Sequence, residues 1–289
     1  MNVERIADVP SNTGEGPLWH PVEKVAYWTD IPAGRLYRYD PATGANECVL
    51  QGRPIGGFTL QADGSLLLFR DKGGVDIWRD GKIVKTVIES MPGHEATRFN
   101  DVCATHAGNV YCGTMHGHYY NLATDGTITL VRDGYLCPNG MGFSPDNKWM
   151  YYNDAGRGKT YRWAYDMKSG AISNDTVLHD AKADTAYPGA PDGMCVDAEG
   201  FIWIARWGGY GILRHSPVDG KIVAKIDIPT RCVSSVCFGG DNLDTMYVTT
   251  AGGQDRNADD SKAGSFFRVT GSGFTGLVRP VSRVGIGFV

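Results

Sequence analysis

Oxygen-bearing side chains recur at the start of short apolar segments along this chain of 289 residues. The carboxyl and amide groups stand at Glu15, Asn100, Asn139 and Asp192. Asp and Asn are unfavourable in strands, so their repeated placement before strand-like segments calls for a reason. Clustered carboxylates repel one another unless a cation or a proton lies between them. Oxygen-only ligands suit a hard divalent cation, so a fold that gathers these positions could hold a metal ion.

A repeat of about 40 residues sets the positions of these side chains. Runs rich in Val, Ile, Tyr, Trp and Thr lie between turn signals of the Asp-Gly type, which predicts strands closed by tight hairpins. The 39 glycines exceed the roughly 20 of average usage and agree with many turns. Six units open at intervals of 41, 43, 39, 53 and 42 residues, at Gly16, Gly57, Asn100, Asn139, Asp192 and Ser234.

Four strands in each repeat of this length are typical of a β-propeller blade. We therefore predict an all-β fold, a six-bladed β-propeller formed by a single domain over residues 1–289. The run 3–9 belongs to no unit and is predicted to supply the outer strand that closes the last blade. A β-sandwich or two small β domains is the alternative. No Pro- or Ser-rich linker divides the chain, and the repeat runs unbroken through its middle, which favours the propeller.

The first strand of each propeller blade lines the central channel, so residues that open these strands converge at one axial mouth. This predicts a metal site in the channel. Asn-Gly and Asp-Gly are also common turn pairs, and Asn139-Gly140 and Asp192-Gly193 could be no more than that. Spacing alone leaves both interpretations open.

Six short motifs follow one another in a fixed order. They lie at 13–19 (Thr-Gly-Glu-Gly-Pro-Leu-Trp), 98–101 (Arg-Phe-Asn-Asp), 113–115 (Gly-Thr-Met), 138–140 (Pro-Asn-Gly), 191–197 (Pro-Asp-Gly-Met-Cys-Val-Asp) and 237–240 (Cys-Phe-Gly-Gly). Together they resemble the senescence-marker-protein family, also called the gluconolactonase/regucalcin family. The resemblance covers nearly the whole chain. It implies a six-bladed propeller with one divalent metal in the channel, in a family of which many members hydrolyse sugar aldonolactones.

The resemblance also implies roles for individual residues. Glu15, Asn139 and Asp192 match the family's metal ligands, and Asp192 also matches its general base. Arg98 and Asn100 match residues that hold the oxygens of the substrate, with Asn100 near the metal.

Two further positions concern the surroundings of the site. Asp154 matches an aspartate near the floor, behind the ligands. After Met115 the family often carries acidic residues, whereas this chain reads His116-Gly117-His118. His118 is therefore predicted to contact the substrate near the place of a family acid. The segment 184–190 is longer than the connection that the family has there. Both departures from the family pattern, after Met115 and at 184–190, are expected on the substrate side of the site.

Three aromatic residues are candidates for packing on a sugar face, or else ordinary core and rim residues. They are Tyr119, Trp207 and Tyr210.

The implied function is a metal-dependent hydrolase that opens glucono-, xylono- or arabinolactone to the aldonic acid. A divalent cation would polarise the lactone carbonyl, and Asp192 would assist the attack of water. Ca²⁺ and Zn²⁺ are the ions expected first, and oxygen ligands also admit Mg²⁺ and Mn²⁺. Two alternatives stay open: a metal-dependent hydrolase of another ester or phosphoester, and a non-catalytic calcium-binding propeller.

Composition and missing motifs argue against other classes. The net charge of −4 disfavours nucleic acid as a partner. No apolar run approaches about 18 residues, and residues 1–10 contain no apolar stretch, so we expect no membrane span, no secretory signal and a cytoplasmic protein. The seven scattered cysteines form no C-x-x-C pair, and no G-x-S-x-G nucleophile motif is present. The expected partner is a small sugar lactone, bound by a monomer or weak homo-oligomer.

Overall fold

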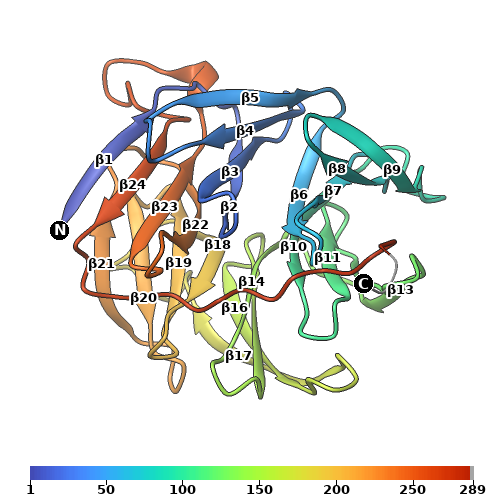
Figure 1. The fold of residues 1–289 in the computed structure, drawn as a ribbon. Helices are drawn as coiled ribbons and strands as arrows, with labels where there is room; N and C mark the ends of the chain where they lie inside the picture. Colours follow the sequence, from blue (N-terminus) through green and yellow to red (C-terminus); the bar gives the residue numbers. More distant parts are fainter. Residues whose placement is uncertain (287–289) are drawn as a thin grey trace.

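Short strands joined by tight turns form six four-stranded antiparallel sheets in the computed structural model, which describes residues 1–286. The sheets stand around a central axis like the blades of a propeller (Figure 1). Turn chemistry explains the hairpins: Asp80 and Gly81, with φ of 51° and 82°, form a two-residue connection with both residues in the left-handed region. The predicted all-β, six-bladed propeller is confirmed.

Each of the first three blades is built from four consecutive strands. Blade one contains β2 (Gly14–His20), β3 (Val25–Asp30), β4 (Arg35–Tyr39) and β5 (Asn46–Gln51). Blade two contains β6 (Ile55–Leu60), β7 (Leu66–Arg70), β8 (Val75–Arg79) and β9 (Lys82–Ile88). Blade three contains β10 (Phe99–Ala104), β11 (Val110–Thr114), β12 (Tyr119–Leu122) and β13 (Ile128–Arg132).

The next two blades repeat this order, and the last is completed from the other end of the chain. Blade four contains β14 (Pro138–Phe143), β15 (Trp149–Asp154), β16 (Lys159–Tyr165) and β17 (Ile172–Asp180). Blade five contains β18 (Ala190–Val196), β19 (Ile202–Trp207), β20 (Gly211–His215) and β21 (Ile222–Asp227). Blade six contains β22 (Val233–Gly239), β23 (Thr245–Thr250), β24 (Phe266–Thr270) and β1 (Asn2–Ala7), and the 3₁₀ helix η1 (Gly253–Asp255) follows β23.

The N-terminal strand closes the ring. β1 pairs with β24 in antiparallel register, with Val3 opposite Val269. The predicted closure of the last blade by the N-terminal run is therefore confirmed. Aromatic stacking reinforces this junction, because the ring of Trp28 in blade one lies between Tyr37, at 5.0 Å, and Phe266 of blade six, at 4.2 Å. Buried aromatic rings of this kind contribute a large apolar area to the contacts between blades.

The inner strands of blades three, four and five each carry a bulge in which two residues oppose one. Asn100 and Asp101 lie opposite a single residue of β11. Asn139 with Gly140, and Asp192 with Gly193, do the same against β15 and β19. Successive residues of a regular strand point to opposite faces, whereas a bulge re-aims one of them. The bulges therefore stand where the polar side chains of the inner strands meet the channel.

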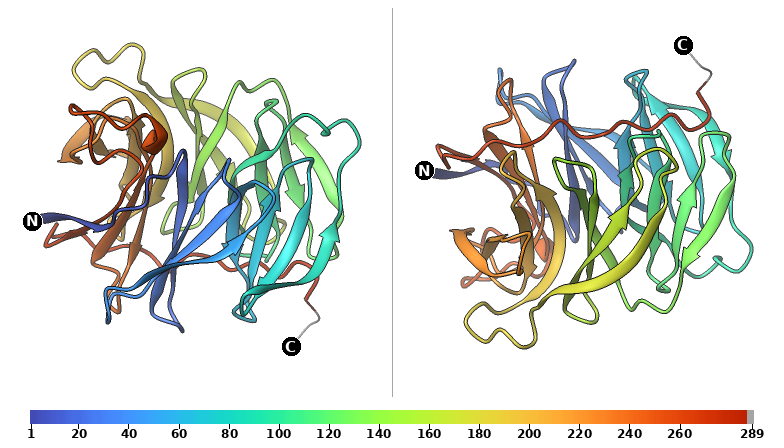
Figure 2. Two further views of the ribbon diagram at one scale, coloured as in Figure 1. Left: turned by 90° about the horizontal axis from the view of Figure 1, so that it is seen from above. Right: turned by 90° about the horizontal axis from the view of Figure 1, so that it is seen from below.

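A final segment without a repeat of its own follows β24. Residues 271–286 run across one face of the propeller, as the two views of Figure 2 show. Within residues 1–286, no helix has the length and hydropathy needed to cross a membrane. All seven cysteines are free thiols, in agreement with the absence of a disulfide pattern in the sequence.

Candidate functional site

A cavity of about 340 Å³ lies at the mouth of the channel where the inner strands begin. Its lining comes from blades one, three, four and five and falls into three tiers. The innermost tier consists of Glu15, Asn100, Asn139 and Asp192. The middle tier consists of Thr13, Arg98, Cys137 and Ala190. The outer tier contains Ile31, Met115, Ala155 and Trp207, with Gly156 beside them.

Strand geometry explains the tiers. The middle-tier residue precedes the innermost one by two positions in each blade, so both side chains lie on the same face of the strand. The outer-tier residue is held opposite the middle-tier residue by the second strand of the blade or its continuation. In blade one, for example, the Ile31 amide donates to the Thr13 carbonyl at 3.0 Å, and in blade three the Met115 amide donates to the Arg98 carbonyl at 3.1 Å. The repeat thus delivers equivalent positions to one cavity.

The two predicted carboxylate ligands are buried beside further negative charge. Glu15 and Asp192 are 4% and 5% exposed. Burial raises the pKa of Glu15 well above its usual range, and the charges of Asp192 and Asp101 add to the rise. Burial followed by the charge of Asp101 does the same to the pKa of Asp192. Burial also raises the pKa of Asp101 to about 6. Three carboxyl groups in this setting favour a bound cation, because a cation offsets their repulsion.

The amide side chains are linked to the arginine by a chain of hydrogen bonds. Arg98 Nη1 donates to Asn100 Oδ1 at 2.7 Å. Asn100 Nδ2 in turn donates to Asn139 Oδ1 at 3.2 Å and to the Pro138 carbonyl at 2.6 Å. Because the oxygen of Asn100 is taken by Arg98, the geometry gives Asn100 the task of orienting Asn139.

Asp154 lies behind the residues that line the cavity and anchors the chain segment that leads into Asn139. It is fully buried, and its carboxylate accepts hydrogen bonds from the amides of Leu136, Cys137 and Arg157 at 3.0 to 3.3 Å. These bonds fix the chain just before Asn139. The side chain is therefore placed to support the site from outside the cavity.

Two supporting residues were not identified from the sequence. Asp30 occupies in blade one the place of Asp154 in blade four, and its carboxylate accepts from the amides of Asn12 and Thr13, just before Glu15. Asn153 Nδ2 donates to the Asp192 carbonyl at 2.6 Å and so ties blade four to blade five. The signal for Asp30 was available: Trp28-Thr29-Asp30 ends the second strand of its unit as Tyr152-Asn153-Asp154 does.

The donor set fits a hard divalent cation. The innermost tier offers two carboxylates and two amides, and oxygen atoms are the preferred ligands of such ions. Within residues 1–286, no three His, Cys, Asp or Glu side chains cluster closely enough to hold a metal. A site here consequently needs the amide oxygen of Asn139 as well as Glu15 and Asp192. The innermost tier contains no His or Cys; Ca²⁺, Mg²⁺ and Mn²⁺ accept oxygen-only ligands, and Zn²⁺ also accepts carboxylates.

The histidines proposed for the substrate side lie elsewhere. The ring of His118 packs against His94 and Tyr120, with ring centroids 5.8 and 5.9 Å away, and the cavity lining does not include it. The reason is the hairpin after β11: the Thr114 amide donates to the His118 carbonyl at 2.9 Å, so His118 leads directly into β12, the next strand outward, and only Met115 of this hairpin reaches the cavity. His116 is exposed and also lies outside the lining.

The three aromatic candidates lie in different surroundings. Trp207 lines the cavity and is 40% exposed. Tyr119 is a core residue, fully buried and stacked on Tyr111 at 5.3 Å. Tyr210 is exposed and does not line the cavity. Only Trp207 is therefore placed to touch a ligand.

Comparisons with known proteins agree with this architecture. The family model for the SMP-30/gluconolactonase/LRE-like region matches residues 13–252. Pentonolactonase XacC of Haloferax volcanii is 44% identical over 285 residues, covering 96% of this chain and 94% of that protein. The 6-deoxy-6-sulfogluconolactonase of Pseudomonas putida is 31% identical over 258 residues, 87% of each chain. A crystal structure of regucalcin, a calcium-binding protein of Agrobacterium tumefaciens, superposes with a TM-score of 0.87 at 25% identity, covering 97% of both chains. The chain belongs to the SMP-30/gluconolactonase/regucalcin family.

Proposed function

We propose that this protein is a sugar lactonase that works as one propeller domain and opens aldonolactones in the channel cavity with the help of a divalent cation. The observation that carries the proposal is the convergence of Glu15, Asn139 and Asp192, with Arg98 and Asn100, on one cavity of about 340 Å³. Relatives named as lactonases support it. Pentonolactones are the first substrates to test, because the Haloferax volcanii relative named for them is 44% identical.

The proposed chemistry divides the work between the tiers. Glu15, Asn139 and Asp192 would hold the cation, which supplies Lewis-acid polarisation of the lactone carbonyl when it is bound. Asp192 is buried beside the reacting centre and accepts the proton of the attacking water at its carboxylate, a contribution of about 10²- to 10⁴-fold. Arg98 uses Nη1 for Asn100 and for the Phe99 carbonyl, which leaves other N–H groups of its planar fork for substrate oxygens.

The outer tier favours a small substrate that carries no charged group at the end far from the lactone carbonyl. Ile31, Met115, Ala155 and Trp207 offer no charge and no hydroxyl. The C–H face of a sugar ring can pack on such side chains, as on the indole of Trp207. A lactone of five or six carbons suits a cavity at the lower end of the usual range for ligand sites, about 300 to 1,000 Å³. We therefore propose recognition of hydroxyls near the carbonyl by Arg98 and little polar recognition further out.

Ca²⁺ is the cation we propose to test first. The support is the oxygen-only inner tier and the likeness to a regucalcin described as calcium-binding. Mg²⁺ and Mn²⁺ satisfy the same donors, and Zn²⁺ is the fourth ion of the test.

Acid release from a panel of pentono- and hexonolactones tests the function. The panel is run above the spontaneous rate, before and after chelation, for the wild type and Asp192→Ala. Asp166→Ala is the matched control, because Asp166 is an exposed turn aspartate far along β16 from the cavity. We expect turnover that disappears on chelation, returns with one cation and falls at least 100-fold in Asp192→Ala only. Turnover that survives exhaustive chelation, or none on any lactone, would overturn the proposal, and a parallel panel of aryl esters and organophosphates tests the alternative substrates.

A further inference from the structure

The C-terminal segment crosses the far end of the channel as a strap, defined here as residues 275–283. On one side the Ala198 amide donates to the Thr275 carbonyl at 2.8 Å, and the Gly276 amide donates to the Leu243 carbonyl at 2.7 Å. On the other side Ser282 exchanges backbone bonds of 2.9 Å with Leu60 and Ala62. The strap thereby joins blades five and six to blade two. The six residue steps from Gly276 to Ser282 can span up to about 20 Å.

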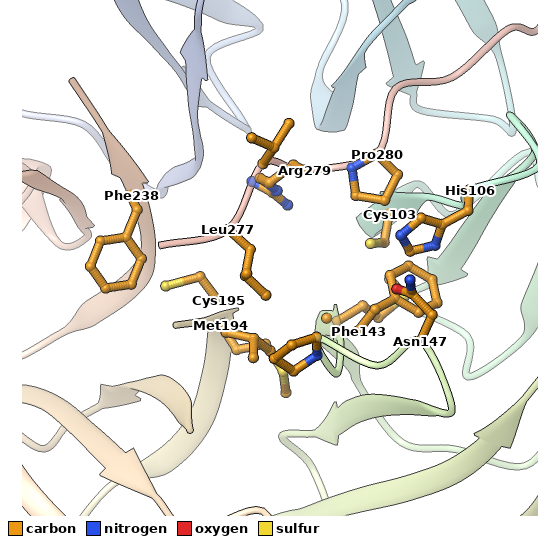
Figure 3. Close-up of a pocket in the computed structure, with 15 residues that line it drawn as sticks. Cys103, His106, Phe143, Asn147, Met194, Cys195, Phe238, Leu277, Arg279 and Pro280 are labelled. Carbon is orange, nitrogen blue, oxygen red and sulfur yellow. The ribbon is translucent and has the colours of Figure 1, made fainter. Parts of the chain in front are cut away.

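Arg279 is exposed to solvent at this end of the channel, and its side chain also reaches inward from the strap. Its neighbour Val278 is 85% exposed and faces outward. Arg279 lines the cavity of about 370 Å³ on one side of the strap and that of about 120 Å³ on the other. In Figure 3 the guanidinium points from the strap toward the middle of the larger cavity, with Cys103, Cys195 and Leu277 around it. Among residues 1–286, no Lys, Arg, Asp or Glu other than Arg279 lines either cavity.

The same side chain reaches the layer directly beneath the cation site. A small cavity of about 30 Å³ is lined by Arg279 and Asp101 together. Its other lining residues include Pro17, Met141 and Met194, each two positions after Glu15, Asn139 or Asp192. Arg279 Nη1 lies 3.5 Å from the Pro17 carbonyl. A cavity of this size has room for a water molecule between the guanidinium and the carboxylate.

The bulge of β10 explains why a carboxylate faces this layer. Asn100 and Asp101 are consecutive, yet both point into the channel, Asn100 toward the upper cavity and Asp101 toward the small one below. Asp101 shares its small cavity with Pro17, Met141 and Met194, so its carboxylate lies in the layer next to the inner tier. Its own charge is opposed chiefly by Arg279 and then by Arg98.

We propose that Arg279 is a counter-charge, carried by the C-terminal strap, that offsets the charge of Asp101 beneath the inner tier and so sets the affinity of the site for its cation. Arg279 acts through Asp101 and the channel field, and it is a positioning residue rather than a catalytic one. This inference rests on the proposed function, because it assumes that a cation binds at Glu15, Asn139 and Asp192.

The sign of the effect follows from charge alone. A positive charge in the channel repels a divalent cation above it and also cancels the attraction that Asp101 would exert. Removal of the guanidinium leaves three carboxylates balanced by Arg98 only, so the metal-free protein becomes less stable and the cation binds more tightly. A change of about tenfold in the dissociation constant is the size expected for a unit charge acting across a partly hydrated channel.

Calcium binding to the metal-free protein tests the proposal. Isothermal titration is run on the wild type, Arg279→Met, Arg279→Lys and Arg283→Met. Arg283 is an exposed cation of the same strap and lines none of the three cavities, so its variant controls for the loss of charge from the strap. We expect Arg279→Met to bind Ca²⁺ about tenfold more tightly than the wild type, and Arg279→Lys and Arg283→Met to remain within about threefold.

Unchanged or weaker binding by Arg279→Met would overturn the inference. If that variant is too unstable without metal for titration, its affinity is taken from the dependence of its unfolding temperature on Ca²⁺ concentration. If the wild type binds Ca²⁺ and opens lactones but Arg279→Met binds Ca²⁺ with unchanged affinity, only the role of Arg279 is refuted. A wild type that binds no divalent cation refutes the proposed function as well.

Discussion

Replacement of Asp154 by alanine tests whether a carboxylate outside the cavity holds the site in place. The carboxylate is fully buried and accepts the amides of Leu136, Cys137 and Arg157. Alanine leaves all three donors without this acceptor. Hydrogen bonds to a charged group contribute about 1.5 to 3 kcal/mol each, and the effects of neighbours are not additive, so we expect the free energy of unfolding to fall by about 4 kcal/mol. The ion pair with Arg157 adds little, since that side chain is 39% exposed.

The site should respond together with the fold. The anchored amides precede Asn139 by two and three residues, so their release lets the Asn139 side chain, a proposed ligand of the cation, move. We expect Asp154→Ala to bind Ca²⁺ at least fivefold more weakly at a temperature where it remains folded, a loss of about 1 kcal/mol. Asp154→Asn retains one acceptor oxygen and should recover about half of the lost stability.

Urea unfolding and calcium titration of the same preparations provide the assay. Asp166→Ala is the control, because the Asp166 carboxylate also accepts two backbone amides but does so on an exposed turn, where water replaces it. We expect this control to leave both quantities nearly unchanged. An Asp154→Ala protein within about 1 kcal/mol of the wild type, with unchanged calcium affinity, would show that the buried acceptor does not anchor the strand.

Three further outcomes are expected. Asp30→Ala should weaken calcium binding at least threefold in the same titration, because Asp30 anchors the chain before Glu15, and an unchanged affinity would contradict that role. The raised pKa values of Glu15 and Asp192 mean that the folded metal-free protein binds protons more tightly than the unfolded chain. Its stability should therefore fall as the pH rises above the ordinary carboxyl range of about 4, whereas excess Ca²⁺ should flatten this dependence in urea unfolding. Trp207→Ala should raise the lactone KM several-fold and leave kcat and the unfolding temperature nearly unchanged. Tyr210→Ala, a change outside the cavity, should alter none of these quantities. Equal effects of the two substitutions would exclude a substrate contact for the Trp207 indole.

The blades were predictable because their signals are local and repeated. Asp-Gly turns and alternating apolar runs define each hairpin, and six units that open at intervals of 39 to 53 residues leave few other closed arrangements. The strap was not predictable in this way, because its residues pair with blades two, three, five and six through one or two backbone bonds each and carry no period. The proposed role of Arg279 depends on the path that those backbone bonds give the chain. No pattern in the neighbouring sequence predicts that path.

The candidate site also contains residues whose placement the sequence predicts and residues whose placement it does not. Glu15, Asn139 and Asp192 stand at or next to the openings of their units, so the repeat predicts that they lie at one mouth of the channel, and the family resemblance singles them out as candidate ligands. His118 was assigned by its place after a motif, and the tight hairpin there turns it outward. Asp101 was indistinguishable from its neighbour Asn100, because only the bulge sends two consecutive side chains to different levels of the channel.

The glycines beside Asn139 and Asp192 lie in strands and not in turns. Asn139-Gly140 and Asp192-Gly193 lie inside β14 and β18, and neither glycine has a positive φ. A Cβ on Gly140 would lie 2.5 Å from the Met194 amide nitrogen, and one on Gly193 would lie 2.0 Å from Ser235 Oγ. Each glycine therefore lets its strand approach the inner strand of the next blade. The inner strands can come close enough for the residue before each glycine to share one small cavity with its counterparts only because these positions carry no side chain.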